Sequence, residues 1–438
     1  MIFVNKLNLT GNNKKIQEVS KSWLENIEKI IPVDLDQSAK DYGALIRKRG
    51  VKNASDLLKI LMIYATGKIS VRILSVAASA LKISDISDTA WNKRISLSAA
   101  WLAFLLDSVL SSIVNPSEEK LSKNRNVYLI DSTYFRQEGK TRKLYRAHIN
   151  YCLNTGCMHE IKVTDIHTAE SLTVYEIMEN GIYIADAGYG KATQIAYALS
   201  KSADVLFRMT PNQVALYDKD GEKLNTSSIL KTKKSTIDLH CFIKHNKILI
   251  PVRIIASRLP EDKIEAAIKH KKRQSQRMQT KLKPETLIYA EWVILVTSLD
   301  TSFSPTEILS IYRSRWQIEL LFKRIKQNLM IHLIRAASPK YALAIIELWL
   351  LIWAISERQL LIFQNILLFK NLDPQRFSIW ALSQLTFIQT LLIIECQWSS
   401  LINEYNFASF ANFLLNHKSS RINQYASLTL CTFSSNLS

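Results

Sequence analysis

The sequence predicts an α/β protein in which a core with a mixed sheet is interrupted by a β-rich insertion and flanked by helical regions. Three patterns lead to this fold class. The N-terminal part carries apolar residues at helical spacing, the part after it alternates apolar strands with helices, and a second strand-rich stretch precedes a late helix. We therefore expect a helical N-terminal region (1–120), the first part of the core (121–210), the insertion (211–300), the last helix of the core (301–340) and a helical C-terminal region (341–438).

Composition and charge indicate an ordered globular protein with a polyanionic partner. The 438 residues are 47% hydrophobic and 22% charged, and the formal net charge is +19, from 57 Lys+Arg against 38 Asp+Glu. Such a surplus indicates nucleic acid first and an anionic membrane second, with solubility as the plain alternative.

Several features favour the cytoplasm. The five cysteines are sparse, odd in number and lack zinc spacing, so buried thiols are expected. The first fifteen residues are too polar for a signal peptide. The most apolar tract, residues 341–355, is shorter than a bilayer span and contains Glu347. We expect a core helix there and no membrane insertion.

The N-terminal region contains the outline of a helix-turn-helix. Residues 70–95 read as one helix, a polar turn at 84–87 and a second helix that starts near Asp88. An ordinary pair of antiparallel helices fits the pattern equally well. In the first interpretation the residues that face DNA are Thr89, Trp91, Asn92, Lys93 and Arg94.

The core region has three strands followed by alternating helix and strand, which is the ribonuclease-H-like order. The strands are expected at residues 127–135, 143–151, 158–164, 181–186 and 204–209, with helices at 169–178 and 192–200.

The insertion is predicted to be three strands and one basic helix. The strands are expected at residues 236–243, 247–257 and 287–298, and the helix opens at Pro260. Its lysines and arginines form either a solvated face or a surface that follows phosphates, and the net charge favours the second interpretation.

One late segment, residues 311–330, carries four polar side chains that share a helix face. Wound as a single helix, it places Tyr312, Arg315, Glu319 and Lys326 within roughly 60° of arc, and the remaining surface is largely apolar. For an isolated helix, a structural salt-bridge stripe is the better interpretation. The tyrosine and the apolar surroundings favour a functional stripe.

Three carboxylates are candidates for a shared metal site. Asp131 and Asp186 each follow an apolar strand, and Glu319 lies on the late helix. Converging acids repel one another unless a cation lies between them, and hard oxygen ligands select Mg²⁺. Two such ions can activate a nucleophile and stabilise the leaving oxygen of a phosphodiester. Asp165, beside His167, is the alternative to Asp186, but an aspartate before a helix is usually a cap.

These residues resemble a known family. The spacing Tyr312-x2-Arg315-x3-Glu319-x6-Lys326 is similar to the Y-R-E-K signature of IS4-family bacterial transposases of the DDE group. The stretches LIDSTYF and GIYIADAGYGK resemble the family's first- and second-aspartate regions. The resemblance covers about residues 40–370. One departure is Ala187, because the family usually has an arginine directly after the second aspartate.

The resemblance implies a ribonuclease-H-like catalytic domain with Asp131, Asp186 and Glu319 as catalytic metal ligands. It implies two Mg²⁺ ions, with Mn²⁺ able to replace them, and cut-and-paste transposition through a DNA hairpin. The implied partners are double-stranded DNA with terminal inverted repeats, target DNA and a second copy of the chain in the DNA complex. The implied location is the bacterial cytoplasm, at the nucleoid. The implied DNA-binding residues are Tyr312, Arg315, Lys326 and Trp292.

Trp292 and the activity itself have alternative interpretations. A strand tryptophan is more often a core residue than one that stacks on an extruded base. A non-catalytic, sequence-specific DNA-binding protein derived from a transposase would need the basic charge and the helix-turn-helix but not the acids. A ribonuclease-H-like nuclease without strand transfer would leave the insertion without a role.

Overall fold

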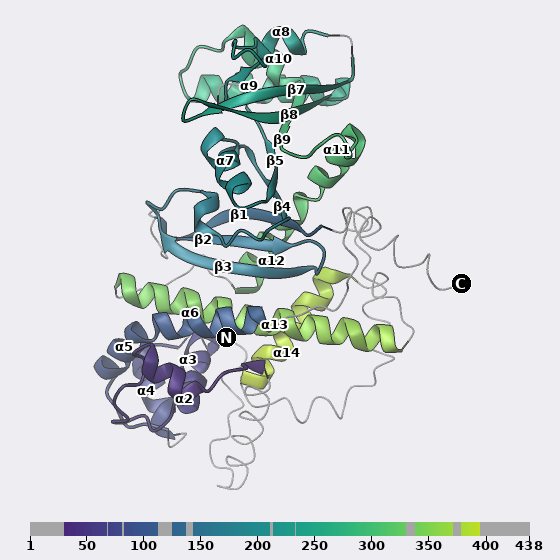
Figure 1. Ribbon diagram of the computed structural model, residues 1–438. Helices are drawn as coiled ribbons and strands as arrows, with labels where there is room; N and C mark the ends of the chain where they lie inside the picture. Colours follow the sequence, from purple (N-terminus) through teal and green to yellow (C-terminus); the bar gives the residue numbers. More distant parts are fainter. Residues whose placement is uncertain are drawn as a thin grey trace. The chain divides into compact units, whose positions relative to one another are not determined.

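The chain divides into two compact units in the computed structural model, which is described here for residues 30–67, 69–80, 83–112, 125–136, 143–210, 213–232, 234–329, 338–370 and 378–394 (Figure 1). The first unit comprises Met1–Asn115, Tyr134–Arg146 and Phe322–Ser438. The second comprises Pro116–Thr133 and Ala147–Leu321.

The first unit is mainly helical and also contains the end of strand β1 (Val127–Arg136) and the start of strand β2 (Lys143–Cys152). Helix α13 packs against α3, α5, α6 and α14, so the N-terminal and C-terminal helices share one core. The helices are α2 (Leu35–Asp41), α3 (Ala54–Gly67), α4 (Val71–Ala80), α5 (Asp88–Leu97), α6 (Ala99–Ser111), α13 (Pro339–Phe369) and α14 (Ile379–Ile394).

Helices α4 and α5 are the two helices expected around the polar turn. Ser87 caps α5, because its side chain accepts a hydrogen bond from the backbone N–H of Ala90 at 3.3 Å. Thr89 and Lys93 are exposed, as expected for residues that face DNA. Trp91 is fully buried, so its expected contact with DNA is wrong. Burial of this tryptophan removes a large apolar surface from water, so Trp91 contributes to the hydrophobic core.

Helix α13 contains the apolar tract. Within the described residues, Pro339–Gln364 is long and apolar enough to cross a membrane, but 78% of its most apolar window is buried inside the protein. The bent pair α5–α6 passes the same test of length and composition only when it is treated as one span. A core helix of a soluble protein has the same properties, so these segments are weak indications of a membrane protein.

Glu347 lies in this buried helix and is 5% exposed, with no ion-pair partner in the part of the chain that the structure describes. Burial raises the pKa of its carboxyl group to about 8, from an ordinary value of 4.5. Above pH 4.5 the unfolded chain releases this proton, whereas the folded chain keeps it until about pH 8. The free energy of unfolding therefore falls as the pH rises through this window.

We expect Glu347→Gln to remove this pH dependence. Between pH 5 and pH 7 the wild type should lose about 2–3 kcal/mol of stability that the variant keeps, because each pH unit corresponds to about 1.4 kcal/mol. Urea unfolding at pH 5, 6, 7 and 8 measures the difference between the two proteins. Parallel curves for wild type and variant would contradict an unpaired, neutral Glu347.

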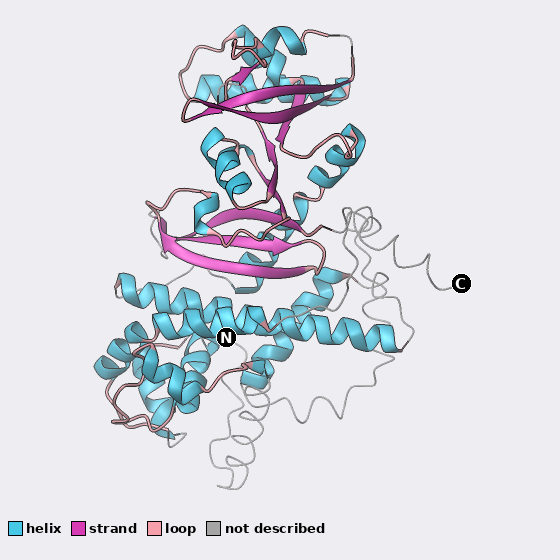
Figure 2. Cartoon of the chain, viewed as in Figure 1, coloured by secondary structure: helices cyan, strands magenta, loops and turns pink. Residues whose placement is uncertain are grey.

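A nine-stranded sheet, most of which belongs to the second unit, has the order β3-β2-β1-β4-β5-β9-β8-β7-β6. Its strands are drawn in magenta in Figure 2. Strands β1, β4 and β5 are parallel neighbours, and β9 runs antiparallel to both β5 and β8. The strands are β1 (Val127–Arg136), β2 (Lys143–Cys152), β3 (Cys157–Asp165), β4 (Ile182–Ala185), β5 (Asp204–Arg208), β6 (Leu216–Tyr217), β7 (Thr236–His245), β8 (Ile248–Arg258) and β9 (Trp292–Thr297).

Helices of this unit include the expected basic helix. The helical segments are the 3-10 turns η2 (Leu172–Val174) and η3 (Ala187–Tyr189), and helices α7 (Ala192–Ser200), α8 (Thr226–Leu230), α9 (Glu261–Arg277), α10 (Pro284–Ala290), α11 (Pro305–Arg313) and α12 (Trp316–Leu329). The α12 helix begins in this unit and ends in residues assigned to the first. The mixed α/β fold and the order of the first five strands agree with a ribonuclease-H-like domain.

Two expected elements are different in the structure. The helix expected at residues 169–178 is reduced to the three-residue turn η2, where the Gln194 side chain takes the backbone N–H of Leu172 at 2.6 Å. The strand expected from residue 287 begins only at Trp292, because Pro284 opens the short helix α10. Strand β9 then joins the insertion's strands to the core, so the two form one continuous sheet.

Candidate active site

Asp131 follows the four buried residues that begin β1. Its Oδ1 accepts a hydrogen bond from the backbone N–H of Ser132 at 2.7 Å. Burial, together with the negative charges of Asp186 and Glu170, raises the pKa of Asp131 to about 7, although the Ser132 N–H and Arg315 oppose the shift. Asp131 is thus a carboxyl group close to two other carboxylates.

Asp186 stands at the carboxyl end of β4, the parallel neighbour of β1. Its Oδ1 accepts the backbone N–H of Gly188 at 2.7 Å and caps the turn η3. Val127 pairs with Ile182 in the register, so both strands deliver their aspartates toward the same edge of the sheet. The two aspartates predicted from the sequence are therefore brought together.

A pair of buried tyrosines supports both aspartate segments. The Tyr175 hydroxyl donates to the Asp131 carbonyl oxygen at 3.1 Å and lies 3.2 Å from the Tyr189 hydroxyl, which belongs to η3. Both side chains lie in the hydrophobic core of this unit. Sequence reasoning did not identify this support.

The sequence predicted one helix for the signature segment, residues 311–330, but the structure has two. Helix α11 ends at Arg313 and α12 begins at Trp316, so Tyr312 closes the first helix and Glu319 lies in the first turn of the second. The Ser314 hydroxyl donates to the Ile311 carbonyl oxygen at 2.5 Å. The backbone amides of Ser314 and Arg315 donate to the carbonyl oxygens of Ile311 and Tyr312 at 3.1 and 3.0 Å, which tightens the turn. The prediction that all four side chains share one 60° arc of a single helix is therefore wrong.

Arg315, in the turn between these helices, is surrounded by acidic groups. Its guanidinium forms an ion pair with Glu319, one turn later. Burial alone would lower the pKa of Arg315, but Tyr312, Glu319 and Asp131 raise it above its ordinary value. Arg315 thus interacts electrostatically with Asp131 of the sheet and with Glu319 of α12.

Tyr312 lies in the same environment. Burial raises the pKa of its hydroxyl group to about 12, while the charges of Arg315 and Arg208 act in the opposite direction.

Lys326, the last residue of the signature, is exposed in the last turn of α12, in residues assigned to the first unit.

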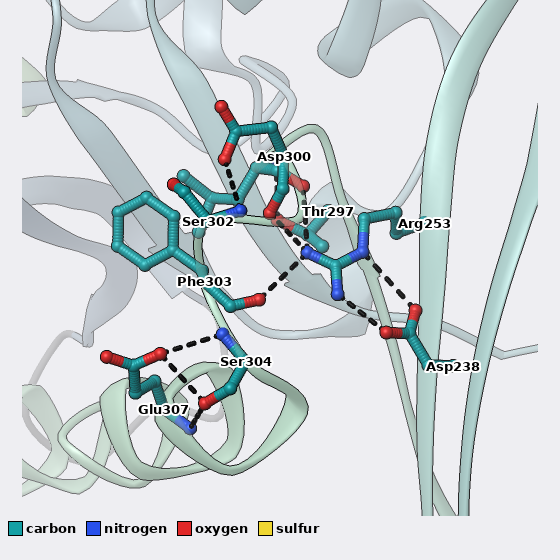
Figure 3. A network of polar contacts seen from close by, with 9 residues as sticks. Asp238, Arg253, Thr297, Asp300, Ser302, Phe303, Ser304 and Glu307 are labelled. Carbon is teal, nitrogen blue, oxygen red and sulfur yellow. Dashed lines mark hydrogen bonds and ion pairs between the residues drawn. The ribbon is translucent and has the colours of Figure 1, made fainter.

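A buried arginine of the insertion fixes the loop that leads to these helices (Figure 3). Arg253 of β8 is 4% exposed and binds Asp238 of β7 through two nitrogen atoms, at 2.7 and 3.3 Å. Its Nη1 also donates to the carbonyl oxygens of Leu299 and Phe303, at 3.3 and 3.0 Å, and to that of Asp300. The loop then enters α11 through a capping box formed by Ser304 and Glu307.

We expect Arg253→Lys to destabilise the protein by about 1–3 kcal/mol, because an ammonium group cannot reproduce this fork of hydrogen bonds. Arg258→Lys is the matched control. Arg258 lies on the same strand but is 39% exposed, and its pairs with Glu261 and Glu291 should contribute less than about 1 kcal/mol. Urea unfolding measures the stability of both variants. Equal unfolding midpoints for Arg253→Lys and Arg258→Lys would contradict the anchoring role of Arg253.

Trp292 and Asp165, two other residues considered from the sequence, lie in environments that favour structural roles over functional ones. Trp292 is 4% exposed within the hydrophobic core, which supports the core-residue alternative and leaves base stacking by this side chain without access. Asp165 is exposed and accepts the N–H groups of His167 and Thr168 at 2.7 and 3.1 Å, so it is a turn cap.

Three residues near the site were missed from the sequence. Glu170 accepts the Ser132 hydroxyl at 2.6 Å, and its Oε2, like Asp186 Oδ1, lies 3.0 Å from where a Cβ on Gly188 would stand. Arg208 ends β5, and Trp316, directly after Arg315, is 52% exposed. The sequence shows the tryptophan next to Arg315, but only the structure shows that it is exposed.

The donor set suits a divalent metal, although the acids do not yet surround one. Within the described ranges, no three histidine, cysteine or acidic residues are placed to hold an ion. Glu319, the third predicted ligand, forms an ion pair with Arg315. Mutual repulsion between Asp131, Asp186 and Glu170 is the condition that a bound cation relieves. The carboxylate oxygens of Asp131 and Asp186 are therefore donors of the kind that Mg²⁺ prefers.

Residues 122–355 match the transposase DDE domain family, which is more than half of the chain. The chain belongs to this family. It is 29% identical over 322 residues to the putative transposase InsL for insertion sequence element IS186A of Escherichia coli K12, covering 72% of this chain and 86% of that protein. The transposase for insertion sequence element IS421 of Escherichia coli is also 29% identical, over 323 residues. These relatives agree with the resemblance to IS4-family transposases.

Proposed function

We propose that this protein is the transposase of an insertion sequence and that Asp131, Asp186 and Glu319 cut and join the ends of its element. The observation that carries the proposal is the convergence of two strand-end aspartates with the Arg315–Glu319 pair of the signature segment. The DNA substrate is duplex with terminal inverted repeats, and the product is joined to target DNA by a dimer of the chain.

The acids would hold two Mg²⁺ ions, or Mn²⁺ in their place, which supply charge for activating water or a 3′-hydroxyl and for stabilising the leaving oxygen. Asp131 and Asp186 are already adjacent at the sheet edge. Asp131, with a pKa of about 7, must lose its proton before it can serve as a ligand. Ser132, through its N–H, and Tyr175, through the Asp131 carbonyl, hold that residue in place.

Arg315 acts as an exchangeable partner for Glu319. Without DNA it neutralises the glutamate. A phosphate group of the bound strand competes for the guanidinium, since phosphate accepts two parallel hydrogen bonds from arginine as well as carboxylate does. Exchange frees Glu319 to join the two aspartates, so binding of DNA completes the site. Tyr312 and Lys326 then contact neighbouring phosphates of the same strand.

Hairpin formation requires an extruded base and an accessible aromatic side chain to hold it. Trp292 was the residue expected from the sequence, but its burial speaks against that role. Trp316 is exposed and lies three residues before Glu319, so we assign the stacking to Trp316 instead.

Linear DNA that carries one end of the element, incubated with the protein and Mg²⁺, tests the proposal on denaturing gels. A transposase produces a nick at the element's end, then a hairpin, and finally joined products with added target DNA. Nicks alone indicate a nuclease without strand transfer. Binding without any nick indicates the non-catalytic DNA-binding alternative. Either result contradicts the proposed function.

A further inference from the structure

The first unit contains a strongly basic loop, residues 46–52, between α2 and α3. Its sequence is IRKRGVK, and it exposes four cationic side chains together with Ile46, which is 69% exposed. The cations are Arg47, Lys48, Arg49 and Lys52. Such a density of positive charge in seven residues requires a partner or a solvated surface.

The loop is held in place from both sides. Val51 is fully buried next to the start of α3. Gly50 has a φ of +81° and lies so close to Ile86, in the turn before α5, that a side chain there would collide with it. The Arg94 guanidinium of α5 donates to the Arg49 carbonyl oxygen at 3.1 Å. A solvated charged loop needs none of these contacts, whereas a binding surface gains affinity from being pre-organised.

Most of the loop's charge is uncompensated. Lys48 forms an ion pair with Asp36 at 2.9 Å, but both side chains are about half exposed, so the pair is weak. Arg47, Arg49 and Lys52 have no ion-pair partner within the ranges that the structure describes. Exposed Lys93, the residue before Arg94, adds a further cation from α5.

We propose that residues 46–52 bind the phosphate backbone of duplex DNA beside α5, so that Thr89 and Lys93 of this helix reach a groove. The loop supplies affinity that is independent of sequence, and α5 supplies the contacts that depend on it. This places the DNA contact of the first unit on the α2–α3 loop as well as on the expected helix pair. The proposal rests on the proposed function, because it takes DNA ends as the substrate.

The test is the salt dependence of DNA binding by the full chain, measured by fluorescence anisotropy with EDTA present so that no cutting occurs. The probes are a 40-bp duplex from the element's end and a scrambled duplex. The variant Arg47→Ala/Arg49→Ala/Lys52→Ala should lower the slope of log Kd against log[KCl] by about 2–3 on both duplexes, since each phosphate contact contributes about 0.9. Between 50 and 200 mM KCl, it should therefore lose roughly 40-fold less affinity than the wild type.

The variant Arg47→Lys/Arg49→Lys/Lys52→Arg is the matched control, because it keeps all three charges and should keep the wild-type slope. An alanine variant with the wild-type slope and melting temperature overturns the proposal. So does a variant that binds DNA normally but loses binding to vesicles of anionic phospholipid, which would identify a membrane surface. Thr89→Ala should weaken only the element-end duplex.

Cleavage by the wild type, assayed separately with Mg²⁺, distinguishes failure of the loop from failure of the proposed function. Normal cleavage with an unchanged slope in the alanine variant rejects the loop alone. A wild type that neither binds nor cuts the element's end rejects both.

Discussion

Alanine at Asp131, Asp186 or Glu319 is expected to lower strand cleavage by about a thousandfold or more and to leave DNA binding intact. Residues that act as one catalytic unit lose nearly all of their effect when any single member is removed. The cationic residues that we propose as DNA contacts, including residues 46–52, are unchanged in these variants. Cleavage on denaturing gels and anisotropy in EDTA measure the two properties independently.

Asp165→Ala is the control for this prediction. Its carboxylate is exposed and caps a turn, so cutting should stay close to the wild-type rate. Loss of cleavage in Asp165→Ala together with activity in Asp186→Ala would show that the second aspartate was assigned wrongly. Near-normal cutting by any one of the three acid variants would remove that residue from the site.

The strands that carry the aspartates could be predicted because their sequences are simple. Val127–Ile130 and Ile182–Ala185 are short, continuous apolar runs, as expected for strands buried on both faces, and each is followed by a single acid. Parallel neighbours deliver such acids to the same edge, so their proximity follows from the topology. Helix α7 and the basic helix α9 were equally clear from their periodicity and from Pro260.

The break between α11 and α12 could not be predicted from periodicity. Residues 311–330 satisfy a helical pattern throughout, and serine is tolerated in helices. The break depends on the Ser314 side chain, which takes the Ile311 carbonyl oxygen and tightens the turn. As a result Arg315 lies in the turn between the two helices. From this turn it interacts with both Glu319 and Asp131.

Pairing across the chain was also invisible in the sequence. Strand β9 reads as part of the insertion, but its Leu295 and Val296 pair both with β5 of the core and with β8. Long-range pairing of this kind depends on the whole sheet and leaves no local pattern. The same placement buries Trp292, whose depth could not be read from its neighbours.

Trp292→Ala is expected to lower the free energy of unfolding by about 3–5 kcal/mol, because truncating a buried tryptophan leaves a large cavity. The side chain is 4% exposed in a core shared by strands β4, β5, β8 and β9. All DNA-processing steps should then decline together as the folded fraction falls. Trp292→Phe should recover much of the stability, since the smaller ring still fills part of the space.

Trp316→Ala provides the contrast, because this tryptophan is 52% exposed beside Arg315. Its melting temperature should stay near that of the wild type, since exposed substitutions usually change stability by less than about 0.5 kcal/mol. Loss of one stacked base of about 1–3 kcal/mol should slow the hairpin step roughly ten- to a hundredfold and leave the first nick unchanged. Nicked and hairpin products, quantified beside thermal unfolding, separate the two tryptophans. If Trp292→Ala kept a normal melting temperature and accumulated nicked ends, the stacking residue would be Trp292 and not Trp316.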